Sequence, residues 1–229
     1  MEEVRQVRIT AVIPALNEGR DVARALASVK TAPDVEVIVV DGGRDFETLE
    51  ESGGFGAKVI FTGPGRAVQM NAGARAASGD ILLFLHADTV LPGGYDGLIR
   101  RAMQSSADTV AGAFTLKIDS PDRRLRVIER LANWRSEALN MPYGDQAIFV
   151  RAAAFFGVGG FPEMPIMEDF ALMRRLGRVG GIAHITEPVV TSARRWTKDG
   201  FYKTTLVNQA IIIGYMAGLP LKTLRGWYG

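Results

Sequence analysis

Two neighbouring acidic residues, Glu168 and Asp169, follow a loop rich in glycine and proline and precede the helical pattern DFALMRRL. A carboxylate at a junction of loop and helix can accept a proton from a substrate hydroxyl, which is the work of a general base. The same pair would also suit an ordinary helix start, where Asp169 caps the helix and Glu168 faces the positive end of its dipole. The pair by itself leaves both interpretations open.

Asp88 comes just after the apolar run ILLFL. A carboxylate at the end of a buried strand is the hard oxygen ligand that Mg²⁺ and Mn²⁺ prefer, and substrate phosphates can complete such a site. His86 points to the same side of an extended chain and could join the metal or the phosphate. As alternatives, Asp88 caps the following turn and His86 is a hydrogen-bonded residue at a strand end.

The segment GPGRAVQMN places Arg66 at an expected helix start and Asn71 slightly more than one turn further on. A helix N-terminus beside an arginine favours phosphate binding. The segment also nearly matches a dinucleotide fingerprint, Gly63-x-Gly65-x-x-Val68, but the third glycine is missing and the motif does not open the fold. We expect a phosphate site here and keep a nicotinamide dinucleotide as the weaker alternative.

Arg194, Arg195 and Trp196 combine planar donors for phosphate oxygens with a ring that could stack on a sugar or a base. The alternative for this stretch is a solvated basic loop.

The elements that must position these residues are short apolar runs, each followed by loop residues and a helical pattern: RITAVIP, VEVIVV, AKVIFT and DILLFL. Continuous apolar runs are typical of strands that helices cover on both faces of a parallel sheet. In such open α/β sheets ligands bind beyond the carboxyl ends of the strands. The polar loops expected at that edge contain Pro14, Ala15, Asn17 and Glu18, then Asp41 and Gly42, then Gly63 to Arg66, and then His86, Ala87 and Asp88.

The remaining patterns predict helices at about residues 20–30, 66–77, 93–104 and 122–139 and one that starts near Met167, with further strands at VAGAFTLKI and QAIFVR. We therefore expect one α/β domain over residues 1–229, with a mostly parallel central sheet flanked by helices.

The composition narrows the classes of protein that fit. With 229 residues, 47% hydrophobic and 23% charged, the chain lies in the soluble globular range. It has no cysteine, which excludes disulfides, zinc-thiolate sites, iron–sulfur clusters and a cysteine nucleophile. The first residues, MEEVRQVRIT, lack the features of a secretory signal, so a cytoplasmic location is expected.

Positive charge gathers in the C-terminal quarter, where residues 170–229 hold 9 Lys/Arg and 2 Asp/Glu. The apolar run AIIIGYMAGLPL in this quarter has 12 residues, too few to cross a bilayer. With its basic and aromatic neighbours it could lie on an anionic membrane at the inner face. The alternatives are a helix that closes the core and a homodimer interface.

Taken in order, these motifs resemble the family-two glycosyltransferases with the glycosyltransferase A fold, over nearly the whole chain. The resemblance rests on AVIPALNE, IVVDGG, GRAVQMNAGARAASGDILLFLHADT, GGFPEMPIMEDFALMRRL and SARRW. The segments HADT, GDQAIF and MEDFAL are most similar to the radical-SAM/selenodomain-associated transferase subgroup.

The resemblance implies an inverting, non-processive glycosyltransferase that moves a sugar from a nucleoside-diphosphate sugar, with UDP slightly preferred, to an acceptor hydroxyl, assisted by Mn²⁺ or Mg²⁺. Residues 1–90 would form the nucleotide-sugar half, and residues 91–229 the acceptor half with a C-terminal helical segment. Asp169, with Glu168 beside it, would be the base, Asp88 would bind the metal, and Arg195 and Trp196 would contact the leaving diphosphate or the acceptor. The nucleotide sugar would be bound by Pro14, Ala15, Asn17, Glu18, Asp41, Gly42, Arg66, Asn71, His86, Ala87 and Asp88.

Two departures from the family pattern matter. His86-Ala87-Asp88 stands where the family usually has Asp-x-Asp, so one carboxylate is missing. The segment TSARRW also lacks the glutamine of the processive members, which argues against a polysaccharide synthase.

Two other functions remain as alternatives. A nucleotidyltransferase of related fold would place a glycine-rich loop after the first strand, where PALNEG has one glycine. A non-catalytic nucleotide-binding module would not need the pair Glu168 and Asp169. The acceptor, whether sugar, small molecule or lipid, is not defined by these motifs, and we expect no nucleic acid partner.

Overall fold

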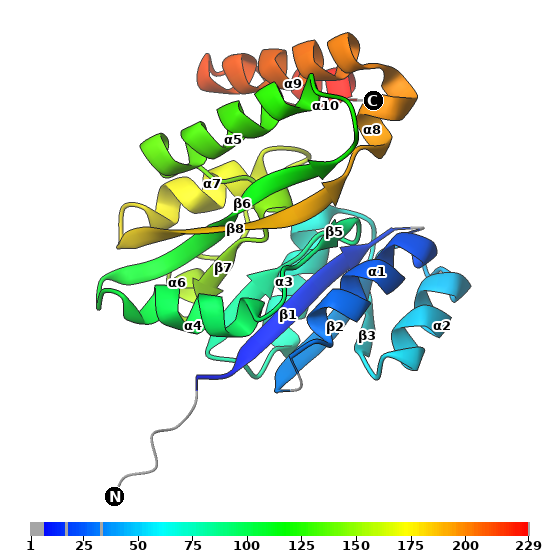
Figure 1. Cartoon of the computed structure of the whole chain (residues 1–229), viewed down its shortest axis with the longest axis vertical. Coiled ribbons are helices and arrows are strands. Elements are labelled where there is room, and N and C mark those ends of the chain that lie inside the picture. The colour runs from blue at the N-terminus through cyan, green and yellow to red at the C-terminus, as the bar shows by residue number, and fades with distance from the viewer. Residues whose placement is uncertain (1–6, 17, 33, 229) are drawn as a thin grey trace, which may run out of the picture.

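The computed structural model describes residues 7–16, 18–32 and 34–228 and shows one continuous sheet with helices on both faces (Figure 1). Its strands are β1 (Ile9–Ala15), β2 (Val35–Asp41), β3 (Lys58–Phe61), β4 (Ile81–Phe84), β5 (Thr89–Val90), β6 (Thr109–Asp119), β7 (Phe149–Arg151) and β8 (Gly181–Ser192). The helices are α1 (Gly19–Val29), α2 (Phe46–Gly54), α3 (Arg66–Ala76), α4 (Tyr95–Gln104), α5 (Leu125–Leu139), α6 (Ala152–Gly157), α7 (Glu168–Leu176), α8 (Arg194–Asp199), α9 (Phe201–Met216) and α10 (Leu221–Tyr228), with a 3₁₀ turn, η1 (Gly144–Gln146).

The strand order in the sheet is β3-β2-β1-β4-β7-β6-β8-β5. The first four strands pair in parallel, as does β6 with β8, whereas β7 runs antiparallel to both of its neighbours and β5 runs antiparallel to β8. The expected fold class, a single α/β domain with a mostly parallel sheet, is therefore confirmed.

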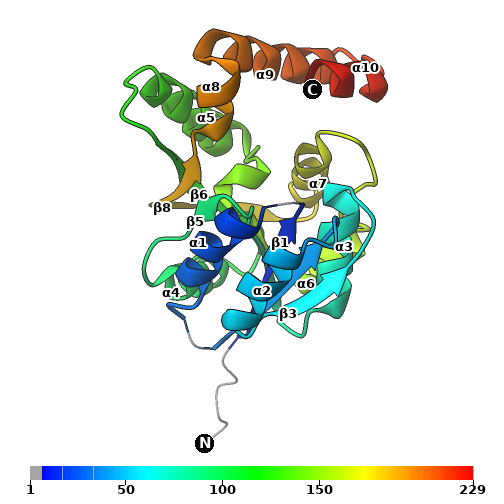
Figure 2. The same ribbon diagram turned by 90° about the vertical axis from the view of Figure 1, so that its right-hand side faces the viewer.

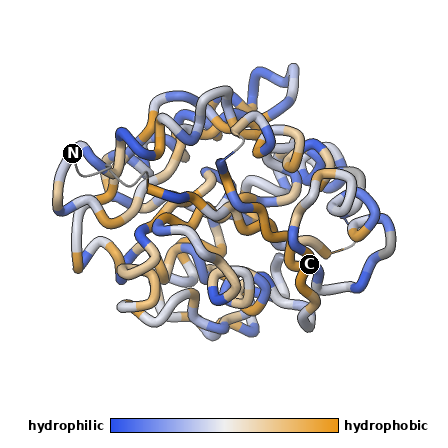
Figure 3. Tube along the Cα trace, turned by 90° about the horizontal axis from the view of Figure 1, so that it is seen from below, coloured by the Kyte–Doolittle hydropathy of each residue, from blue (hydrophilic) through white to orange (hydrophobic). Residues whose placement is uncertain are grey.

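The strands have continuous apolar sequences because helices cover both faces of the sheet. In β1, Ile9 and Ile13 face a cluster that includes α1 and α4, whereas Val12 faces a cluster that includes α3, α6 and α7. Because both faces of the strand are covered, every residue from Ile9 to Ala15 is buried. Apolar segments accordingly run through the centre of the molecule when it is seen from below (Figure 3).

The predicted helices at about 20–30, 66–77, 93–104 and 122–139 and near Met167 correspond to α1, α3, α4, α5 and α7. Several elements were not expected, and the largest of them are the helix α2 and the long strand β8. Within QAIFVR only Phe149 to Arg151 form a strand, since Gln146 belongs to the turn η1.

Helices α8, α9 and α10 form an outer layer at one end of the molecule, beside α5 (Figures 1 and 2). Ile211 of α9 and Leu224 of α10 pack against Ile166, Met167 and Phe170 at the start of α7. In the part of the chain that is described, no helix is both long enough and apolar enough to cross a membrane.

Candidate active site

The carboxyl ends of β1, β2 and β4 meet at one edge of the sheet, as expected. Ala15 and Asp41 are register partners, and the Gly42 N–H donates to the Ala15 carbonyl at 3.0 Å. His86, Ala87 and Asp88 follow β4 on the other side of β1. Asn17 lies outside the described residues. This edge therefore gathers most of the predicted nucleotide-binding residues.

Asp41 is fully buried, and its carboxylate is occupied by its own loop. Its Oδ1 accepts the N–H groups of Gly43 at 2.7 Å and Arg44 at 3.0 Å, and its Oδ2 accepts the N–H of Asp45 at 2.7 Å. Asp41 thus fixes the shape of the turn that follows β2.

Gln69 is a site residue that the sequence analysis missed. It is buried on α3, and its amide Nε2 donates to the carbonyls of Ala15 at 2.6 Å and Val40 at 2.8 Å. These bonds tie the ends of β1 and β2 together under the proposed nucleotide site. Nothing in the sequence marks Gln69, because its partners are main-chain atoms of distant segments.

Arg66 begins α3 and forms an ion pair with Glu168 at the start of α7, with Nη1 and Oε1 3.6 Å apart. The Arg66 side chain is 46% exposed, whereas that of Glu168 is 5% exposed. Burial, followed by the charge of Asp169, raises the pKa of Glu168, and the Arg66 guanidinium opposes this rise. The pair brings the predicted phosphate segment and the predicted acidic pair together.

Asp169 is the accessible member of the acidic pair and is held firmly. Its Oδ2 accepts the N–H of Gly144 at 2.7 Å and its Oδ1 accepts the N–H of Phe170 at 2.7 Å. Met167, which precedes the pair, has a left-handed φ of 67° that costs a non-glycine residue about 1–3 kcal/mol. Backbone strain of this kind is concentrated at functional sites, where the surroundings hold it in place.

His86 contacts the same turn. Its Nε2 is buried without a hydrogen-bond partner, and a Cβ built on Gly144 would lie 2.6 Å from it. Burial, and then the charge of Arg66, lowers the pKa of His86 to about 3. The imidazole is therefore neutral at physiological pH, and a side chain at position 144 would force the ring or the turn to move.

Asp145, the next residue of the turn, was also missed. Its Oδ1 is buried without a partner, and burial raises the pKa of Asp145 to about 6 against the opposing charge of Arg135. Gln146 anchors the turn, because its Nε2 donates to the Phe114 carbonyl at 3.0 Å. The sequence signal for this turn is the segment GDQAIF, which is part of the family resemblance but was not predicted as a site.

Asp88 is half-buried, and the charge of Arg194 acts on it, whereas the family resemblance assigned the diphosphate to Arg195 and Trp196. Burial raises the pKa of Asp88, and the Arg194 guanidinium opposes that rise. Arg194 also binds Glu18, with Nη2 and Oε1 3.0 Å apart, and Asp21. Arg194 therefore joins α8 to the loop after β1 on the Asp88 side of the site.

Arg195 and Trp196, the residues that the sequence analysis preferred, make contacts with the C-terminal layer. The Arg195 guanidinium lies 3.5 Å from the centre of the Tyr228 ring and donates to the Tyr228 carbonyl at 3.1 Å. Trp196 packs against the cluster that includes Leu116 and Leu125. Arg195 thus fastens α10, whereas Arg194 faces Asp88.

The Asn71 side chain also binds main-chain atoms of the protein. Its Nδ2 donates to the Phe161 carbonyl at 2.8 Å, and its Oδ1 accepts the Phe161 N–H at 3.0 Å. Gly160 has a φ of 67°, and a Cβ there would lie 2.8 Å from Asn71 Oδ1. Asn71 therefore holds the Gly-Gly-Phe loop that leads to the acidic pair.

The donor set at Asp88 fits a divalent ion only if substrate completes the site. Among the described residues, no group of three His, Asp or Glu side chains could hold a metal. Asp88 offers one carboxylate, and the unpartnered Nε2 of His86 is the nearest additional donor in sequence. Magnesium bound by one or two carboxylates and substrate phosphates is a common arrangement, so the residues present fit such an ion.

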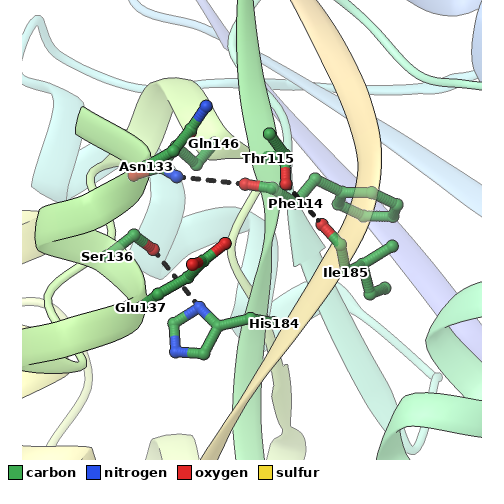
Figure 4. A pocket seen from close by; sticks show the side chains of 8 residues that line it. All are labelled: Phe114, Thr115, Asn133, Ser136, Glu137, Gln146, His184 and Ile185. Carbon is green, nitrogen blue, oxygen red and sulfur yellow. Dashed lines mark hydrogen bonds between the residues drawn. The ribbon is translucent and has the colours of Figure 1, made fainter. Parts of the chain in front are cut away.

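His184, the second histidine of the chain, lies elsewhere. It lies on β8 and points toward α5, where its Nδ1 is 3.3 Å from Ser136 Oγ (Figure 4). Its Nε2 is 3.1 Å from Asn140 Oδ1. Thr115 Oγ1 donates to the Ile185 carbonyl beside it, at 2.9 Å. These contacts connect β8 to α5, so His184 helps to hold α5 in place.

Comparison with known proteins assigns the class of fold. The chain resembles the mannosyltransferase PcManGT from Pyrobaculum calidifontis, solved with GDP-Man and Mn²⁺, with a TM-score of 0.68 and 18% identity over 98% of this chain and 70% of that one. It also resembles glucosyl-3-phosphoglycerate synthase from Mycobacterium tuberculosis, solved with Mn²⁺, UDP and glucosyl-3-phosphoglycerate, with a TM-score of 0.64 and 18% identity over 93% and 81% of the two chains. S. aureus TarS matches with a TM-score of 0.64 and 16% identity over 81% of this chain and 37% of that one. The fold is thus that of the glycosyltransferase A enzymes.

The family follows from the sequence match. The model of glycosyl transferase family 2 matches residues 10–161, and the chain belongs to that family. An uncharacterized glycosyltransferase of Nostoc sp. strain PCC 7120 is 37% identical over 93 residues, which are 37% of this chain and 29% of that protein. The chain thus covers less than a third of this curated relative.

Proposed function

We propose that this chain is an inverting, non-processive glycosyltransferase that moves a sugar from a nucleoside-diphosphate sugar to an acceptor hydroxyl. The observation that carries the proposal is the Asp169 carboxylate, which two main-chain N–H groups hold near the sheet edge. Asp88 lies at the same edge, and the chain belongs to glycosyl transferase family 2. A base and a site for the leaving diphosphate are the two features that such a transfer needs.

Asp169 acts as the base in this proposal. Its carboxylate takes the proton from the acceptor hydroxyl while the hydroxyl oxygen forms a bond to the anomeric carbon. The bond from that carbon to the diphosphate oxygen breaks, and its electron pair leaves with the diphosphate. A single displacement of this kind inverts the configuration at the anomeric carbon. Glu168, buried and paired with Arg66, keeps the start of α7 in place.

The donor would be held by residues 1–90 and the acceptor by residues 91–229. The loops after β1, β2 and β4 would contact the nucleoside, and Asp41 would do so by shaping the turn that follows β2. Arg66 and Arg194 would face the negative charge that grows on the leaving diphosphate. A divalent ion at Asp88, Mn²⁺ or Mg²⁺, would add positive charge there.

A UDP sugar is the proposed donor, and GDP sugars are the main competitor because the similar structures contain UDP in one case and GDP-Man in the other. The likeness of HADT, GDQAIF and MEDFAL to the radical-SAM/selenodomain-associated subgroup also stays a proposal.

The first experiment measures thermal shifts and calorimetric binding of UDP, GDP, CDP, their sugars and NAD, each with Mn²⁺, Mg²⁺ or chelator. A ligand that binds the folded state raises its apparent stability. We expect metal-dependent stabilisation by one nucleoside diphosphate and its sugar. Stabilisation by NAD alone would support the dinucleotide alternative and overturn the proposal.

The second experiment compares Asp169→Asn with Asp34→Asn, a control at an exposed position. Asp169→Asn should keep the donor dissociation constant but lower the release of nucleoside diphosphate by about 10²- to 10⁴-fold, because only the proton acceptor is lost. Asp34→Asn should change neither quantity. Unchanged turnover in Asp169→Asn would remove Asp169 from the role of base, and NMR of the anomeric proton of the product would test inversion.

A further inference from the structure

Helix α9, FYKTTLVNQAIIIGYM, is apolar on average and has no separate polar side, but only one of its sides is covered by described residues. The covered side packs against the start of α7 and against α10 through Val207, Ile211 and Tyr215. The opposite side is 66–71% exposed at Tyr202, Leu206, Ile213 and Met216. A largely apolar helix without a separate polar side is expected in a protein core or in contact with lipid.

The spacing of these exposed residues shows that they form one stripe. Leu206, Ile213 and Met216 lie four, eleven and fourteen positions after Tyr202, which places all four within one narrow sector of a helix. Seven positions after Tyr202 comes Gln209, which is also exposed. The exposed side of α9 is therefore a continuous ridge about 20 Å long.

A second exposed apolar stripe lies on α5 at the same end of the molecule (Figures 1 and 2). Val127, Leu131 and Trp134 are 54–60% exposed and are four and three positions apart. The two helices touch at their N-terminal ends, where the Arg124 guanidinium lies 4.9 Å from the centre of the Phe201 ring. The exposed apolar surface is therefore not confined to one helix.

Charge indicates which partner covers the ridge. Residues 194–228 contain six Lys/Arg and one Asp/Glu, whereas the whole chain has a net charge of only +2. Lys203 follows Tyr202 on α9, Lys198 precedes Tyr202 by four residues, and both are exposed, as is Lys222 of α10. A second copy of the chain, docked ridge to ridge, would bring two strongly positive surfaces together. An anionic bilayer offers the opposite charge together with an apolar interior.

We propose that α9 and α10 form a peripheral docking surface for an anionic lipid bilayer. The exposed side of α9 enters the boundary between headgroups and acyl chains, and Lys198 and Lys203 contact the headgroups. At 16 residues, α9 lies along the bilayer surface and does not cross it. Leu224 and Tyr228 of α10 belong to the same apolar cluster as Met167 and Phe170, which lie beside the acidic pair, so docking brings the bilayer close to the candidate active site.

The test is co-sedimentation of the full chain with vesicles of phosphatidylcholine, with and without phosphatidylglycerol, at low and high salt. We expect binding to the anionic vesicles at low salt, weaker binding at high salt and little binding to phosphatidylcholine alone. Leu206→Gln/Ile213→Gln, which removes the centre of the ridge, should weaken binding at least about ten-fold. Leu49→Gln/Val179→Gln is the matched control, because its two positions are 39% and 58% exposed away from the ridge.

Thermal unfolding of each variant shows whether it is folded, and size-exclusion chromatography at several concentrations tests self-association. Absence of binding to anionic vesicles at low salt would overturn the proposal, as would equal binding by the ridge variant and the control. Self-association that the ridge variant abolishes, without vesicle binding, would assign the ridge to a second copy of the chain. Lys198→Gln/Lys203→Gln should weaken vesicle binding at low salt and have a smaller effect at high salt.

Discussion

Gly144→Ala tests whether the turn η1 sets the position of the proposed base. A Cβ at Gly144 would lie 2.6 Å from His86 Nε2, 3.0 Å from His86 Cε1 and 3.4 Å from Asp169 Oδ2. A contact of 2.6 Å is far inside the normal separation of about 3.5–4.0 Å, so the buried imidazole or the turn must move. Because the Gly144 N–H donates to Asp169, movement of the turn also moves the carboxylate.

Two magnitudes follow from this geometry. Overpacking of a buried site costs about 1–3 kcal/mol, and each kcal/mol lowers the Tm of a chain of this size by about 2–4 °C. A catalytic group displaced by about 1 Å can lose about 10²-fold in rate. We therefore expect Gly144→Ala to lower kcat by about 10- to 100-fold while the donor dissociation constant changes little.

The assay measures the release of nucleoside diphosphate from the donor that calorimetry identifies, together with the Tm. Gly157→Ala is the control, because a Cβ there meets nothing within 4 Å. Combining Gly144→Ala with His86→Ala removes the ring that causes the clash, so the double variant should be less impaired than the two single effects predict when added. A Gly144→Ala protein with the kcat and Tm of the unchanged chain would refute the reasoning.

Three further predictions concern stability and the two arginines. Asn71→Ala leaves both main-chain groups of Phe161 without their partners and should lower the free energy of unfolding by about 2–4 kcal/mol in urea titrations; a loss below 1 kcal/mol, roughly a surface substitution, would contradict this. Because the pKa of Asp145 is raised to about 6, its contribution to stability is complete below the unfolded pKa of about 3.9 and is lost as pH rises through about 6. We therefore expect the free energy of unfolding of Asp145→Asn, measured in the presence of chelator, to rise relative to that of the unchanged chain by up to about 3 kcal/mol between pH 4 and pH 8. A difference that stays constant over this pH range would refute the raised pKa of Asp145. Arg194→Ala should raise the donor dissociation constant with little loss of Tm, whereas Arg195→Ala should speed proteolysis of the C-terminal helices, and the opposite pattern would exchange the roles assigned to them.

Much of the fold could be predicted from local patterns. The apolar runs of β1, β2 and β4 and the periodicity of α4 and α5 are properties of consecutive residues, and the structure confirms these elements. The strand β8 was missed because its exposure alternates irregularly, so it lacks the continuous apolar run of the buried strands. The helix α2 was missed because its short sequence, FETLEESGG, ends in two glycines and has few apolar residues.

The candidate site was predictable only in part. Glu168, Asp169 and Asp88 stand at the junctions of elements, where the sequence marks them. The link between Arg66 and Glu168 crosses about a hundred residues, and the choice of Arg194 over its neighbour depends on the direction in which α8 leaves β8. Sequence spacing cannot supply that direction.

The sequence by itself determined the layers, the polar strand ends and the motifs of the family, because burial on both faces of a strand and helix periodicity are written in neighbouring residues. The tertiary structure alone decided that Gly144 holds Asp169, that Gln69 and Asn71 bind main chain, and that one side of α9 is left uncovered. These features depend on which distant segments meet, and that is set by the packing of the whole sheet and its helices.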